Sequence, residues 1–216
     1  FSHDNKTDPT LSYMLLLENK MHEAKIEISK VNLMNYGKQL ALFNGVTNWF
    51  RRIKKYGNDN KVEVEHYIIS SGLTNMIEGC SFINDINKVY ACEYIFRNGR
   101  GFWPKLAVNY SNKVQYLYRI HKGAFEVNDQ EGVNRKKYFG DYIHVPFEDM
   151  VFFGDGETDV PTFNVLNKNN GKSICVYEET NQKSIDIAKK LFSDGRVHHL
   201  VKNNYEENSE VDLLVK

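Results

Sequence analysis

The chain holds only three cysteines among its 216 residues, namely Cys80, Cys92 and Cys175. Their number is odd and each lies in apolar surroundings, which is typical neither of a disulfide framework nor of a zinc site. We therefore expect three reduced thiols in the core of a cytoplasmic protein.

Charge of one sign is also missing, because 28 Lys and Arg residues balance 28 Asp and Glu residues. Without a basic excess, no nucleic-acid partner is expected, and the basic cluster at residues 51–55 is interpreted as the solvated face of a helix. No apolar run approaches the roughly 20 residues of a membrane span. A membrane partner is therefore not expected either.

The segments that are present alternate between two periodicities. From residue 41 onward, strand patterns at 64–70, 88–96, 150–153, 172–177 and 197–201 alternate with helix patterns at 46–56, 73–80, 112–121, 159–167 and 182–192. This order predicts an α/β fold with a parallel sheet and helices on both faces. Residues 97–108 indicate an antiparallel hairpin or loop, and residues 203–216 a polar tail.

One apolar strand runs directly into two carboxylates. Residues 150–153 read Met-Val-Phe-Phe, which indicates a strand buried on both faces, and Gly154 and Gly156 allow a sharp turn beyond it. Asp155 then stands at the strand end, and Asp159 follows at the start of a helix. Mg²⁺ takes oxygen ligands, commonly one or two carboxylates with water and substrate phosphate, so the pattern predicts a magnesium site. The alternative is a surface turn whose aspartates only cap the helix.

A second apolar segment, residues 66–73, ends in two hydroxyls and a glycine. Ser70 is expected at the strand tip. Its hydroxyl, with the N–H groups of Ser71 and Gly72 at a helix N-terminus, makes the kind of site that holds phosphate. The alternative is a serine that only caps the helix.

A lysine opens the third segment, residues 110–120. Lys113 is expected in the first turn of a helix, where it opposes the helix dipole unless an anion lies beside it. The alternative is a lysine in solvent. The buried face of this helix is expected to comprise Val114, Leu117, Tyr118 and Ile120.

Taken in order, Ser70, Lys113, Asp155 and Asp159 resemble motifs two, three and four of the haloacid dehalogenase superfamily of phosphohydrolases. The resemblance spans residues 43–201 and is closest to the phosphoserine-phosphatase-like branch with a small helical cap. It implies a Rossmann-like core at residues 41–216 and a remnant of the cap at residues 1–40.

The resemblance also implies roles for these residues. Mg²⁺ would be held by Asp155 and Asp159, and the phosphate of a small substrate by Ser70, Ser71, Gly72 and Lys113. Asp155 and Lys113 would be the catalytic residues in this chain. Lys122, which precedes Gly123, is a second choice for the motif-three lysine.

The first motif of that family, an apolar strand ending in Asp-x-Asp-x-Thr or Val, is not found in this sequence. It carries the nucleophile and the first, central strand of the sheet. Without this strand we expect two neighbouring strands with unpaired edges, and either a homodimer or an N-terminal segment supplied from elsewhere.

Two further functions stay open. The first is a non-catalytic module that binds phosphate and metal, or an inactive fragment of such an enzyme. The second is a receiver-like or nucleotide-binding α/β domain, which is disfavoured because the sequence has no Gly-x-x-x-x-Gly-Lys loop and no Gly-x-Gly-x-x-Gly turn.

Overall fold

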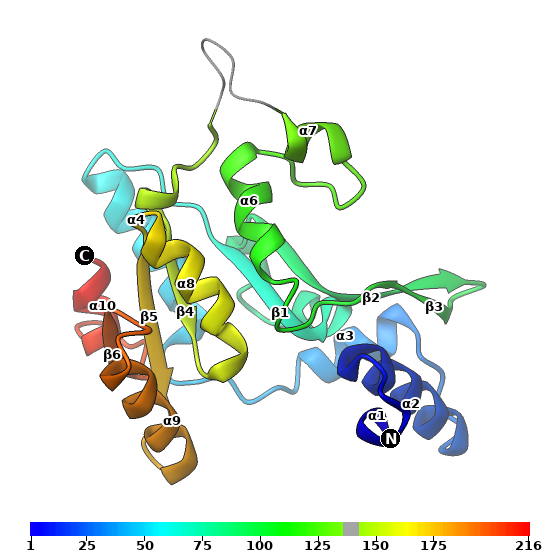
Figure 1. Cartoon of the computed structure of the whole chain (residues 1–216). Helices are drawn as coiled ribbons and strands as arrows, with labels where there is room; N and C mark the ends of the chain where they lie inside the picture. Colours follow the sequence, from blue (N-terminus) through cyan, green and yellow to red (C-terminus); the bar gives the residue numbers. More distant parts are fainter. Residues whose placement is uncertain (136–142) are drawn as a thin grey trace. The chain divides into compact units, whose positions relative to one another are not determined.

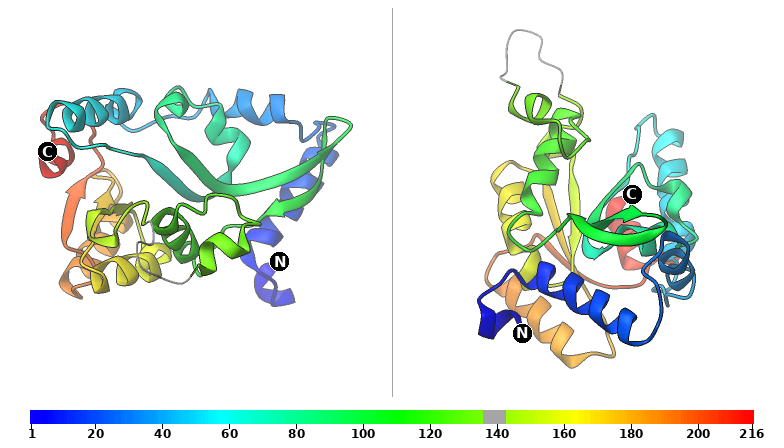
Figure 2. Two further views of the ribbon diagram at one scale, coloured as in Figure 1. Left: turned by 90° about the horizontal axis from the view of Figure 1, so that it is seen from above. Right: turned by 90° about the vertical axis from the view of Figure 1, so that its right-hand side faces the viewer.

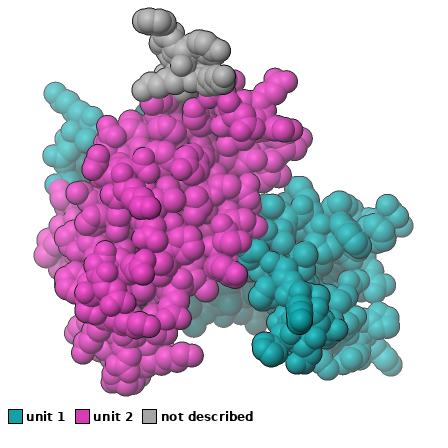
Figure 3. Space-filling view, in the orientation of Figure 1, with its two compact units in different colours: residues 1–109 teal, residues 110–216 magenta. Residues whose placement is uncertain are grey.

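The chain forms two compact units, Phe1–Asn109 and Tyr110–Lys216 (Figure 3). The computed structural model describes residues 1–135 and 143–216. Each unit contains a three-stranded sheet with helices packed against it (Figure 1). No helix in the described residues has the length and apolar character needed to cross a membrane. The expected division after residue 40 stays a prediction.

Side chains that cap the backbone set where the first helices begin. The Asp8 carboxylate accepts the N–H groups of Thr10 and Leu11, and the Ser29 hydroxyl accepts that of Asn32. The helices of the first unit are α1 (Ser2–Asn5), α2 (Pro9–Glu23), α3 (Lys30–Gly37), α4 (Val46–Asp59), α5 (Thr74–Glu78) and the 3₁₀ turn η1 (Ile83–Asp85).

The sheet of the first unit mixes parallel and antiparallel pairing. Strands β1 (Tyr67–Leu73) and β2 (Lys88–Arg97) are parallel, and β3 (Arg100–Leu106) returns antiparallel to β2 as a hairpin (Figure 2). The hairpin expected at residues 97–108 is thereby confirmed. Strand β1 begins and ends three residues later than the expected 64–70, which changes the position of Ser70.

The second unit alternates strands and helices. Its strands are β4 (Val151–Gly154), β5 (Lys172–Tyr177) and β6 (His199–Lys202), and all of their pairings are parallel. The helices are α6 (Val114–Lys122), α7 (Gln130–Asn134), α8 (Val160–Lys168), α9 (Gln182–Ser193) and α10 (Glu210–Val215), with 3₁₀ turns η2 (Phe147–Asp149) and η3 (Glu157–Asp159).

A cluster of buried side chains holds α8 and α9 against β5. Phe163 on α8 and Ala188 on α9 meet Cys175 on β5, and all three are fully buried. Burial of a phenylalanine side chain contributes about 3 kcal/mol, so this contact stabilises the sheet that carries Asp155.

The expected mixed α/β fold with parallel strands and helices is confirmed. Among the described residues, β1 pairs only with β2, and β4 only with β5, so both are edge strands. The three cysteines are free and buried, as expected.

Three expectations about individual segments are wrong. Residues 150–153 were expected to be buried on both faces, but Val151 is 48% exposed because β4 lies at the sheet edge. Helix α6 buries Tyr116 and exposes Tyr118, because the buried face is rotated from the expected one. Part of the expected polar tail is helix α10, which the Ser209 hydroxyl caps and which buries Val211.

Candidate functional site

Strand β4 ends at a glycine that leaves room for the second carboxylate. A Cβ atom at Gly154 would lie 2.7 Å from Asp159 Oδ2 and 2.6 Å from the ring of Phe163. The glycine therefore does more than permit a turn, because it lets the Asp159 side chain fold back over the strand end. The sequence predicted only the turn.

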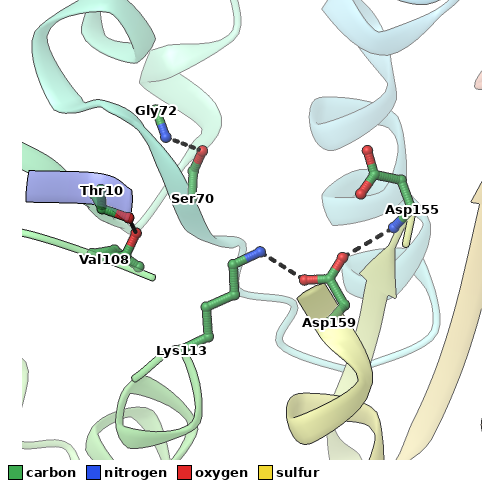
Figure 4. A network of polar contacts seen from close by, with 7 residues as sticks. All are labelled: Thr10, Ser70, Gly72, Val108, Lys113, Asp155 and Asp159. Atoms are coloured by element: carbon green, nitrogen blue, oxygen red, sulfur yellow. Dashed lines mark hydrogen bonds and ion pairs between the residues drawn. The ribbon is translucent and has the colours of Figure 1, made fainter. Parts of the chain in front are cut away.

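Two hydrogen bonds hold the Asp159 carboxylate in place. Lys113 Nζ donates to Oδ1 at 2.6 Å, and the backbone N–H of Asp155 donates to Oδ2 at 3.1 Å (Figure 4). The side chains of Lys113 and Asp159 are only 10% and 4% exposed. The structure thus brings together three of the predicted site residues, which come from two segments of the second unit.

The buried ion pair explains why a lysine is tolerated at the start of α6. A cation there is unfavourable for the helix dipole, but the Asp159 carboxylate lies directly beside it. The reading of Lys113 as a lysine in solvent is therefore wrong. Lys122 behaves differently, since its Nζ donates to the backbone carbonyl of Arg135 at 2.9 Å. This geometry favours Lys113 over Lys122 as the motif-three lysine.

Asp155 differs from Asp159 in its surroundings. Its side chain reaches solvent, yet the atoms packed around it remove part of its hydration, and this desolvation is the main cause that raises the pKa of Asp155. Repulsion by the Asp159 carboxylate raises this pKa further, while Lys113 lowers it. A carboxylate with neighbouring negative charge gains from a cation beside it.

The donor set at the end of β4 fits one protein ligand for Mg²⁺. Asp155 is the accessible carboxylate, whereas both oxygens of Asp159 are already engaged by Lys113 and by a backbone N–H. No group of three or more His, Cys, Asp or Glu side chains in the described residues could hold a metal ion. Mg²⁺ is commonly bound through one or two carboxylates with water and substrate phosphate, so Asp155 suits such a site as a single ligand.

The predicted phosphate residues lie together on β1 in the first unit. The Ser70 hydroxyl accepts the backbone N–H of Gly72 at 3.0 Å (Figure 4), which leaves its own hydrogen available for donation. Two details of the expectation are wrong. Ser70 lies inside β1 and not at its tip, and the N–H of Gly72 is used within the loop because helix α5 begins only at Thr74.

A buried polar network in the second unit was missed from the sequence. The Ser173 hydroxyl lies 2.7 Å from Asn167 Oδ1 and 3.0 Å from His198 Nδ1, and His198 Nδ1 also accepts the backbone N–H of Ser173. Although serine and histidine meet here, Ser173 is fully buried. The network therefore pins the start of β5 to the segment before β6, and it offers no accessible nucleophile.

Comparisons with known proteins identify a distant relative. The chain is 27% identical over 201 residues to an uncharacterized protein of Borreliella burgdorferi, covering 83% of this chain and 67% of that protein. No family model matches the sequence, and no solved structure is similar to it. The proposal of function below therefore rests on the residues of the site.

Proposed function

We propose that this chain is the phosphate- and magnesium-binding part of a hydrolase related to the haloacid dehalogenases, acting on a small phosphomonoester. The observation that carries this proposal is the ion pair between Lys113 and Asp159, which stands next to Asp155 at the carboxyl end of a parallel strand. Ligands of open α/β sheets bind at that end of the strands. The resemblance assigned these three residues to one site before any contact between them was known.

Each residue has a distinct task in this proposal. Asp155 would hold Mg²⁺, which, when bound, neutralises the charge of the phosphoryl group. Asp159 orients the Lys113 ammonium, so that this cation screens the negative charge of substrate and nucleophile. The Ser70 hydroxyl, which accepts the N–H of Gly72, donates its hydrogen to a phosphoryl oxygen.

The attacking carboxylate in this proposal is an aspartate outside the 216 residues, because the sequence lacks the Asp-x-Asp pattern. The edge strands β1 and β4 support the same idea, since each has backbone groups available for a further strand. An aspartyl-phosphate would form when that aspartate displaces the leaving group, and water would then release phosphate.

Magnesium binding tests the metal assignment. Titration calorimetry of the intact chain with MgCl₂ is expected to show saturable binding that Asp155→Asn weakens at least about tenfold, a loss of about 1.4 kcal/mol. Asp194→Asn, a matched change at an exposed carboxylate after α9, is expected to leave the affinity unchanged. Equal affinities for all three proteins would remove Asp155 from the site.

A non-catalytic binding module is the second candidate, and the missing Asp-x-Asp pattern favours it. Sequencing the coding DNA ahead of the Phe1 codon separates the two. An in-frame strand ending in Asp-x-Asp-x-Thr supports the hydrolase, and the protein with that segment should then turn over an aryl phosphate with Mg²⁺. A stop codon or an unrelated sequence leaves the binding module.

A further inference from the structure

The hairpin of β2 and β3 presents an exposed outer face. Its side chains form three cross-strand contacts in a row. Lys105 Nζ pairs with Glu93 at 2.8 Å, Ile95 lies opposite Trp103, and the Arg97 guanidinium stacks on Phe102 at 4.2 Å from the ring centroid. We refer to these six residues as the hairpin face.

The opposite face of the hairpin is anchored within the first unit. The Tyr94 hydroxyl donates to the carbonyl of Met14 at 2.6 Å, and the N–H of Gly101 donates to the carbonyl of Ile28 at 2.6 Å. These bonds hold the hairpin against α2 and the segment before α3. The hairpin face is therefore presented on a fixed support and not on a loose loop.

Large apolar side chains lie in the middle of the hairpin face. Trp103 is 62% exposed, Phe102 51% and Ile95 46%. Isolated exposed apolar residues are common, but three in contact on one rigid element mark an interaction surface. Tryptophan and arginine are also the residues that dominate binding energy at protein–protein interfaces.

The edge of β3 is closed to strand addition, which narrows how a partner can bind. Pro104 has no N–H to donate, and the N–H of Gly101 is already bonded to Ile28. A partner must therefore meet the side chains of the hairpin face and not the backbone edge.

We propose that the hairpin face binds the same face of a second copy of this chain about a twofold axis. The order of charges carries the choice of partner, because Glu93 lies at one end, Arg97 at the other, and Ile95 with Trp103 between them. A twofold axis through the central pair places Arg97 of each copy opposite Glu93 of the other. It also places apolar side chains against apolar side chains, as a self-complementary interface requires.

Sedimentation of the intact chain tests this proposal. The wild-type protein is expected at twice the monomer mass of 25.2 kDa. Trp103→Ala is expected to raise the dimer dissociation constant at least about tenfold. Phe43→Ala is the matched control, because Phe43 is also 51% exposed but lies outside the hairpin. A monomeric wild type, or equal effects of the two substitutions, would overturn the proposal.

A charge exchange tests the twofold arrangement itself. Glu93→Arg and Arg97→Glu are each expected to weaken the dimer at least about tenfold, since each places like charges opposite one another. The double variant restores opposite charges and is expected to recover most of the affinity. Circular dichroism of every variant confirms the fold. A double variant weaker than either single one would contradict the twofold contact, whether or not magnesium binds at Asp155.

Discussion

Lys113 shows how a single buried cation joins two distant segments. Its Nζ lies 2.6 Å from Asp159 Oδ1, and both side chains are almost fully buried. Removing one partner of such a pair leaves an uncompensated charge in the protein. We therefore expect Lys113→Met to lower the free energy of unfolding by about 3–5 kcal/mol, measured by urea denaturation.

Lys122→Met supplies the comparison for that prediction. Lys122 is also on α6, but its Nζ bonds only to the carbonyl of Arg135 in an exposed contact. Its replacement is expected to cost less than about 1 kcal/mol. Similar losses for both lysines would show that the Lys113–Asp159 pair contributes no more than an ordinary surface contact.

His66 gives the first unit a dependence on pH. It is buried between Trp49 and Phe50, and desolvation, aided by the Lys54 cation, lowers the pKa of His66 to about 4. In the unfolded chain a histidine titrates near pH 6.5. The unfolded state therefore binds more protons between pH 4 and 6.5, and stability rises with pH in this window.

The contribution from His66 is expected to be complete above about pH 6.5 and lost as the pH falls toward 4, amounting to about 3 kcal/mol. Denaturation of wild type and His66→Phe at several pH values measures it, because the variant lacks the ionisable group. The difference between the two proteins should change with pH in this window. A constant difference would contradict the prediction. His199→Phe, at an exposed position, is the control.

At the scale of elements, the junction of β4 with η3 depends on close packing at one glycine. Gly154→Ala would place its Cβ 2.7 Å from Asp159 Oδ2, whereas a Cβ at Gly156 would meet no atom within 4 Å. The backbone of Gly156 is extended, so any residue can adopt it. We expect Gly154→Ala to cost about 1–3 kcal/mol in urea denaturation and Gly156→Ala to cost little. If the two alanines cost the same, Asp159 does not depend on the space at Gly154.

The elements also show where pattern reasoning holds. Strand β5 and the start of α4 lie where the sequence predicts them, because a run of apolar residues and a turn signal are properties of neighbouring residues. Strand β1 is displaced by three residues, because its limits follow from pairing with β2 and from the irregular register between Ile69 and Leu73. That displacement moved Ser70 from the strand tip into the strand.

At the scale of the whole molecule, each unit has its own packed core, and both tryptophans, Trp49 and Trp103, belong to the first unit. Phe163→Ala removes a fully buried ring from the second unit and is expected to cost that unit about 3–5 kcal/mol. We expect the unfolding transition seen by far-ultraviolet circular dichroism to shift, and the one seen by tryptophan fluorescence to stay in place. Equal shifts of both would mean that the units unfold as one.

The sequence by itself determined the α/β class, the order of most helices and strands, the reduced cysteines and the acidic turn after β4. These features depend on short-range periodicity and on turn residues, which act between close neighbours. Only the tertiary structure decided that Lys113 meets Asp159 across 46 positions of sequence, that β4 is an edge strand and that Tyr116 is buried in place of Tyr118. Those outcomes depend on strand register and on how helices rotate against a sheet, which are set by packing between distant segments.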